Sequence, residues 1–90
     1  MIATPERPAV AAMYRLQFEP AQDAWVLLYP EGMVKLNTPA AEILRRCNGE
    51  RSVADIVGEL EQAFARPALA DDVHAFLDQA RERGWLRAGA

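Results

Sequence analysis

Hydrophobic and polar residues in the first third of the chain follow the two-residue period of β-strands. Residues 14–19 alternate between apolar and polar side chains, which is typical of a half-buried strand. Residues 25–29 are apolar throughout, as in a middle strand with something packed on each face. Residues 33–37 place Val34 and Leu36 on one face. The pattern predicts a three-stranded antiparallel meander.

The junction between the last strand and the first helix is defined by local signals. Pro30 suits the first central position of a type I turn, and Gly32 suits its last position. Thr38 is a good N-cap residue, and Pro39 fits the first helical position, where no backbone N–H is needed. We therefore expect a tight turn, a short strand and an abrupt helix start.

From residue 38 onwards, apolar residues recur every three or four positions, which predicts three helices. The first is expected to end at Asn48-Gly49, the second to open at a capping box starting with Ser52, and the third to span residues 71–83. The inward-facing positions are Ala40, Ile43, Leu44 and Cys47, then Val53, Ile56, Val57, Leu60 and Phe64, and last Val73, Phe76, Leu77 and Ala80. The order predicts an α+β, winged-helix-like fold: a three-stranded antiparallel sheet followed by three helices.

The length of 90 residues indicates one small domain. Residues 1–13 contain Pro5 and Pro8 and show no period, so we expect a flexible N-terminal arm before a single domain over residues 14–90. We find neither a membrane-length apolar run nor a secretory signal, which favours the cytoplasm and no membrane partner.

Charge and candidate chemistry argue against an enzyme. The net charge of −3 and the pI near 5.0 disfavour nucleic acid. Cys47 and His74 are the only residues of their types, too few for a disulfide or a Cys/His metal site. His74 has no nucleophile near it in sequence, and the acidic residues of the third helix are interpreted as a solvated face. We expect no catalytic residues, no metal and no cofactor.

The strand over residues 33–37 has the clearest functional potential. It is an edge of the predicted sheet, and Lys35 is its only charged side chain. Either the edge stays solvated, or it accepts an extended peptide by strand addition.

Six short segments, in this order and spacing, resemble the PqqD family of pyrroloquinoline quinone (PQQ) biosynthesis. They are Leu27-Leu28-Tyr29-Pro30-Glu31-Gly32, Leu36-Asn37, Ala41-Glu42-Ile43-Leu44, Asn48-Gly49-Glu50-Arg51, Asp72-Val73-His74-Ala75-Phe76-Leu77 and Gly84-Trp85-Leu86. The resemblance extends from about Pro8 to Leu86. Asn48 stands where the family often has an aspartate.

The resemblance implies a non-catalytic peptide chaperone that binds a ribosomal precursor peptide and presents it to a radical S-adenosylmethionine (SAM) enzyme. It also implies that the peptide pairs with the third strand and lies against the third helix. The implied peptide-binding residues are Met33, Val34, Lys35, Leu36 and Asn37, with Phe76, Leu77 and Ala80 as groove walls.

Two other functions remain open on sequence grounds. The chain could be a recognition adaptor of another peptide-modifying system, or a DNA-binding winged helix. The acidic start of the third helix, with Asp71 and Asp72, disfavours DNA. The exposed edge is compatible with a monomer or a weak homodimer.

Overall fold

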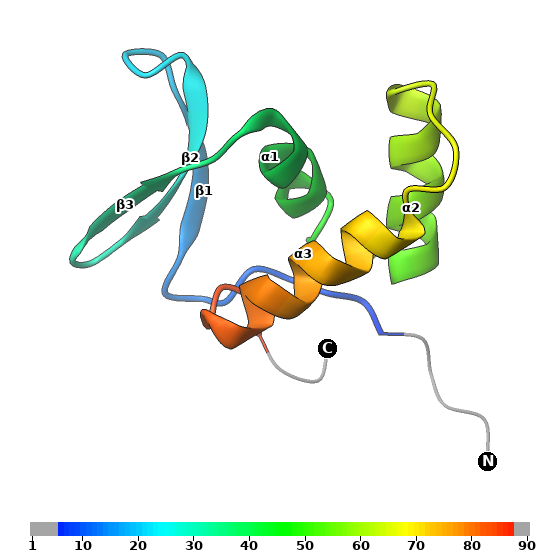
Figure 1. Cartoon of the computed structure of the whole chain (residues 1–90). Coiled ribbons are helices and arrows are strands. Elements are labelled where there is room, and N and C mark those ends of the chain that lie inside the picture. Colours follow the sequence, from blue (N-terminus) through cyan, green and yellow to red (C-terminus); the bar gives the residue numbers. More distant parts are fainter. Residues whose placement is uncertain (1–5, 88–90) are drawn as a thin grey trace.

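The computed structural model describes residues 6–87 and shows a small sheet followed by three helices (Figure 1). The elements are β1 (Arg15–Glu19), β2 (Ala24–Tyr29), β3 (Gly32–Lys35), α1 (Thr38–Arg45), α2 (Val53–Ala63) and α3 (Ala70–Glu82). Both strand pairs are antiparallel, in the order β1-β2-β3. The predicted fold class is confirmed.

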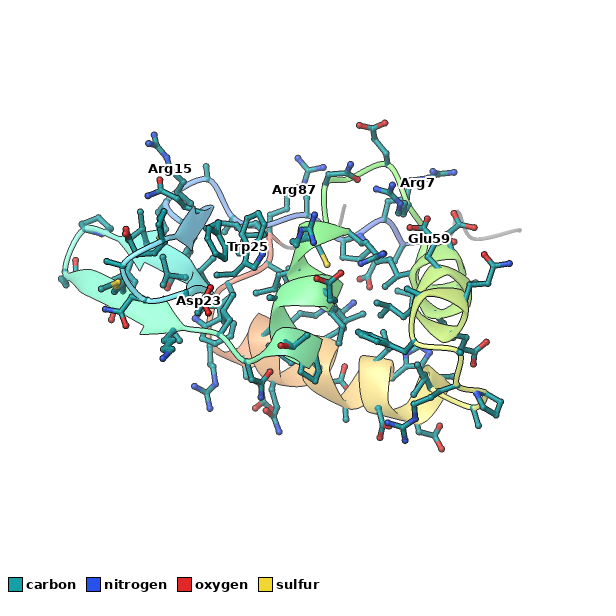
Figure 2. All side chains as sticks on the ribbon, turned by 90° about the horizontal axis from the view of Figure 1, so that it is seen from above. Arg7, Arg15, Asp23, Trp25, Glu59 and Arg87 are labelled. Atoms are coloured by element: carbon teal, nitrogen blue, oxygen red, sulfur yellow. The ribbon has the colours of Figure 1, made fainter. Side chains whose placement is uncertain are left out.

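The register brings apolar side chains of all three strands together on the face of the sheet that meets the helices. Leu27 of β2 pairs with Leu16 and Val34, and it is buried in the common core. Trp25 follows on the same face, between the sheet and α1 (Figure 2). The helices lie to one side of the sheet (Figure 1). In the middle strand, Val26 and Leu27 point to opposite faces and are both fully buried, whereas Met33 of β3 is 48% exposed.

The helix phases agree with the predicted apolar stripes, with one exception at the end of α2. Leu44, Leu60 and Leu77 are almost completely buried in one cluster. Phe64, expected in the core, is 38% exposed. The reason is that α2 ends at Ala63, which leaves Phe64 as its C-cap residue.

The cap of α1 differs from the prediction by one residue. Asn37, not Thr38, is the N-cap residue, and its Oδ1 accepts a hydrogen bond from the backbone N–H of Ala40 at 2.9 Å. Thr38 and Pro39 instead form the first turn. The capping box of α2 is confirmed, with Ser52 and Asp55 exchanging hydrogen bonds of 3.1 Å.

Part of the predicted flexible arm is bonded to the domain. Residues 1–5 lie outside the described residues. Farther along, the Val10 N–H donates to the Cys47 carbonyl at 3.1 Å and the Ala11 N–H to the Trp85 carbonyl at 2.8 Å. Ala9 is buried. The arm prediction is therefore wrong for residues 8–11. These residues contact the domain through isolated β-bridges, which leave no periodic pattern in the sequence from which the contact could be predicted. Among residues 6–87, no helix is long and apolar enough to cross a membrane.

Candidate functional site

The outer edge of β3 presents backbone groups that β2 does not use. The Leu36 N–H donates to the Trp25 carbonyl at 2.9 Å, and Lys35 lies opposite Val26 in the register. Hydrogen-bonded and non-hydrogen-bonded pairs alternate along an antiparallel ladder. The N–H and C=O groups of Met33 and Lys35 therefore point away from β2, where an added strand can bind.

The free edge is shorter than the sequence suggested. β3 ends at Lys35. Leu36 is still hydrogen-bonded to β2, and its side chain is buried in the core. Asn37 uses its side chain to cap α1. Leu36 and Asn37 therefore turn the chain from the sheet into α1, and the backbone edge is centred on Met33 and Lys35.

A groove of about 170 Å³ lies between β3 and α3. It brings together five of the eight predicted site residues, which are Val34, Lys35, Leu36, Asn37 and Phe76. Alternation along β3 puts the Val34 side chain on the α3 side of the sheet, and it packs against the core cluster. The predicted peptide-binding residues of β3 and α3 thus meet across one groove.

Leu77 and Ala80 do not form the groove wall. Both are 0% exposed and belong to the core cluster. Successive helical residues are rotated by about 100°, so these two side chains point into the protein while Phe76 lies beside them on the β3 flank. Their prediction as walls is wrong for this structure because the core of the domain already covers them.

Four further groove residues were missed by sequence reasoning: Ala40 near the start of α1, and three on or after α3. Gln79 and Arg83 follow Phe76 in steps of three and four along α3, and Trp85 follows the helix. The spacing of Gln79 and Arg83 from Phe76 is a helical-face signal that the sequence contains. Trp85 comes after Gly84, which has a φ of 77° and ends the helix. Its fold back onto the groove depends on tertiary packing.

The groove combines an aromatic wall with positive charge. The rings of Phe76 and Trp85 lie 6.4 Å apart between centroids. The Arg83 guanidinium lies 5.3 Å from the centre of the Trp85 ring, within the range of a cation–π interaction. Among the described residues lining the groove, none carries a carboxylate. An extended segment with apolar and acidic side chains fits this surface.

Away from the groove, ionisable groups are used to join helices. Arg46, the C-cap residue of α1, binds both Glu42 and Glu59, and Arg51 also binds Glu59 of α2. The hydrogen bond from Arg46 is the main reason that the pKa of Glu42 is lowered, and the bond from Arg51 has the same role for the pKa of Glu59. These ion pairs link the end of α1 and the loop after it to α2.

The remaining candidate chemical groups have no catalytic setting in the part of the chain that the structure describes. Burial raises the pKa of the Cys47 thiol to about 12, so it stays protonated. Its Sγ donates a hydrogen bond to the Ile43 carbonyl. His74 is exposed on α3. Among residues 6–87, no three metal-ligating side chains gather in one place.

Comparison with known proteins decides the family. A family model described as "Coenzyme PQQ synthesis protein D (PqqD)" matches residues 24–86, more than half of the chain. This chain belongs to the PqqD family. The matched region includes β2, β3, the groove and all three helices, so the family pattern covers the candidate site.

Relatives and solved structures agree with this assignment. A protein of Pseudomonas aeruginosa named PqqA binding protein is 50% identical over 80 residues, 88% of this chain and 87% of the relative. A protein of the same name from Azotobacter vinelandii has the same identity and coverage. The crystal structure of PqqD from Xanthomonas campestris is 34% identical with a TM-score of 0.58, and covers 97% of this chain and 99% of that one.

A second solved structure shares the fold. The solution NMR structure of the PqqD truncation of Methylobacterium extorquens PqqCD has a TM-score of 0.74 at 24% identity, covering 89% of this chain and 87% of that one. That protein is described as a stand-alone recognition element for ribosomally synthesized and post-translationally modified peptides. The PqqD resemblance predicted from the sequence is confirmed.

Proposed function

We propose that this chain is a non-catalytic, cytoplasmic peptide chaperone of PQQ biosynthesis that binds the ribosomal precursor peptide PqqA. The observation that carries the proposal is the outward-facing backbone of Met33 and Lys35 beside the groove lined by Phe76. The name of the 50% identical relative, PqqA binding protein, supports PqqA as the ligand.

In the proposed complex, PqqA adds a fourth strand to the sheet next to β3. The two residues Met33 and Lys35 offer four backbone groups. At about 0.5–1.5 kcal/mol each, such hydrogen bonds supply only a few kcal/mol. Tighter binding requires peptide side chains to bury apolar surface against Val34 and Phe76, at about 25 cal/mol per Å². The strand edge fixes the orientation, and the groove supplies the rest of the affinity.

Strand addition leaves the part of PqqA outside the groove free for chemistry. We propose that the partner enzyme, a radical SAM enzyme, acts on that free part while this chain holds the other. The role is therefore to present the peptide, and the purified chain alone should not alter PqqA.

A binding experiment tests the proposal. Addition of PqqA to the isotope-labelled protein should shift the amide signals of β3 and of the α3 flank that includes Phe76, whereas a duplex DNA control should shift neither. Lys35→Pro removes an N–H that points away from β2, so it should abolish PqqA binding while the helices stay folded.

The matched control uses the other edge of the sheet. Phe18 lies opposite Trp25, and the backbone groups of Trp25 point toward β3. The N–H and C=O groups of Phe18 therefore have no partner on β2 and point outward from β1. Phe18→Pro removes an outward N–H there and should leave PqqA binding unchanged. Normal binding by Lys35→Pro, or equal loss in both variants, would contradict strand addition at β3.

A further inference from the structure

One flank of α3 extends beyond the β3 groove. Leu69, Asp72, Phe76, Gln79 and Arg83 follow one another in steps of three or four residues, so they share one side of the helix. Phe76, Gln79 and Arg83 line the β3 groove. Leu69 and Asp72 line a second hollow. In Figure 1, α3 runs from the α2 side of the molecule to the sheet side, so this flank joins the two hollows.

The second hollow is an apolar pocket of about 280 Å³, which we call the Phe64 pocket. Its inner wall is made of Ile43, Leu60 and Val73, which are core residues. Phe64 stands at its rim and is 38% exposed. The pocket is large enough for an aliphatic or aromatic side chain, and its walls are suited to one.

The loop beside the pocket is bonded to the end of α2. Ala65 and Ala68 have φ values of 51° and 61°, a left-handed conformation that is unfavourable for alanine. The Arg66 N–H donates to the Glu61 carbonyl, and the Leu69 N–H donates to the Glu61 carboxylate, both at 3.0 Å. Strained backbone of this kind is often found next to ligand sites. Here the two bonded residues of the loop, Arg66 and Leu69, themselves line the pocket.

The two hollows are close neighbours. Pro39 lines the Phe64 pocket, and the next residue, Ala40, lines the β3 groove. On α3, Asp72 of the pocket lies one turn from Phe76 of the groove. A chain that leaves the groove beyond Phe76 therefore reaches the pocket directly.

We propose that the bound peptide continues from β3 along this flank of α3 and inserts a large apolar side chain into the Phe64 pocket. This inference rests on the proposed function. Gln79 and Asp72 are seven residues apart, which is about 10 Å along a helix. An extended peptide covers that length with about three residues. The apolar anchor should thus lie about three to five residues from the peptide residue beside Gln79.

Two matched variants and a peptide series test the inference. Phe64→Ser opens the rim of the pocket. The control, Phe18→Ser, changes a phenylalanine of β1 that is similarly exposed, at 43%, and that lines neither the Phe64 pocket nor the β3 groove. Each is titrated with synthetic PqqA and with PqqA peptides shortened one residue at a time from each end. Thermal unfolding verifies that each variant is folded.

The expected result is a loss of affinity of about tenfold in Phe64→Ser for full-length PqqA, with no change in Phe18→Ser. Removal of the one apolar peptide residue that fills the pocket should weaken binding to the unsubstituted protein by the same factor. Its removal should not weaken binding to Phe64→Ser any further. In the unsubstituted protein, amide signals of residues 64–69 should shift with full-length PqqA and not with the shortened peptide.

Two outcomes separate this inference from the proposed function. If Lys35→Pro abolishes binding while Phe64→Ser binds PqqA normally and residues 64–69 do not shift, the peptide ends at the β3 groove and the inference is wrong. If Lys35→Pro also binds normally, the proposed function itself fails. If the partner enzyme binds the Phe64 pocket instead of PqqA, Phe64→Ser will bind PqqA with unchanged affinity. That result would also overturn the inference.

Discussion

Arg83 stacks over Trp85 at the wall of the β3 groove, with 5.3 Å between the guanidinium carbon and the ring centre. The contact holds a positive charge beside an apolar surface. Among the described residues, no carboxylate forms an ion pair with Arg83. The charge is thus available to a ligand, and the ring fixes its position.

Arg83→Gln should weaken PqqA binding by about twofold to fivefold, because it removes from the groove a positive charge whose exposed ion pair with the peptide is worth about 0.5–1 kcal/mol. The dissociation constant should also depend less on salt concentration. Calorimetric titration at two ionic strengths measures both effects. Arg87→Gln, outside the groove, is the control. Equal salt dependence in Arg83→Gln and the parent would show that Arg83 does not meet the peptide.

Leu77→Ala should lower the free energy of unfolding by about 2–5 kcal/mol, since it removes a fully buried side chain. Leu44→Ala and Leu60→Ala should have effects of the same size, and Ala80→Arg should prevent folding because Ala80 has no exposed surface. Urea unfolding followed by circular dichroism measures the change. A folded Ala80→Arg variant with unchanged stability would mean that the phase of α3 is wrong.

Asn37→Ala should destabilise the protein by about 0.5–2 kcal/mol, because the Ala40 N–H loses its capping acceptor. Thr38→Ala should have a smaller effect, since Thr38 lies within the first turn and is not the N-cap residue. Chemical unfolding of the two variants compares neighbouring residues directly. A larger loss from Thr38→Ala would assign the cap to Thr38.

Stability should fall as the pH is lowered through the acidic range, partly because of Glu42. Arg46 lowers the pKa of Glu42 in the folded protein, so the unfolded chain takes up the proton first, near its ordinary pKa of about 4.3. The stabilisation is present above that pH and is lost as the pH falls through the lower, folded pKa. Glu42→Gln should reduce this dependence, as measured by melting temperatures between about pH 3 and pH 7.

Glu31→Gln is the matched control for the acid range. Glu31 lies in the exposed turn between β2 and β3, and it has no ion pair among the described residues. Its melting curve should follow the parent at every pH. If Glu42→Gln follows the parent equally well, the Arg46 contact contributes nothing to the pH dependence.

Much of the candidate site was accessible from the sequence. The alternation around Val34 identified the edge strand, and the PqqD resemblance brought Phe76 into the same site. The errors at Leu77 and Ala80 have one cause. An apolar helical stripe identifies the buried side of α3, but it does not say which of the two adjoining flanks faces β3. Gln79 and Arg83 lie on that flank and are polar, so hydrophobicity alone did not select them.

The sequence by itself determined the features that depend on neighbouring residues. Strand and helix order follows from the periods of two and 3.6 residues, and the start of α2 follows from the Ser52–Asp55 capping box, because each is satisfied within a few residues of chain. Tertiary structure alone decided the docking of residues 8–11, the place of Trp85 in the groove wall and the exposure of Phe64. These depend on contacts between segments distant in sequence, whose partners no local pattern specifies.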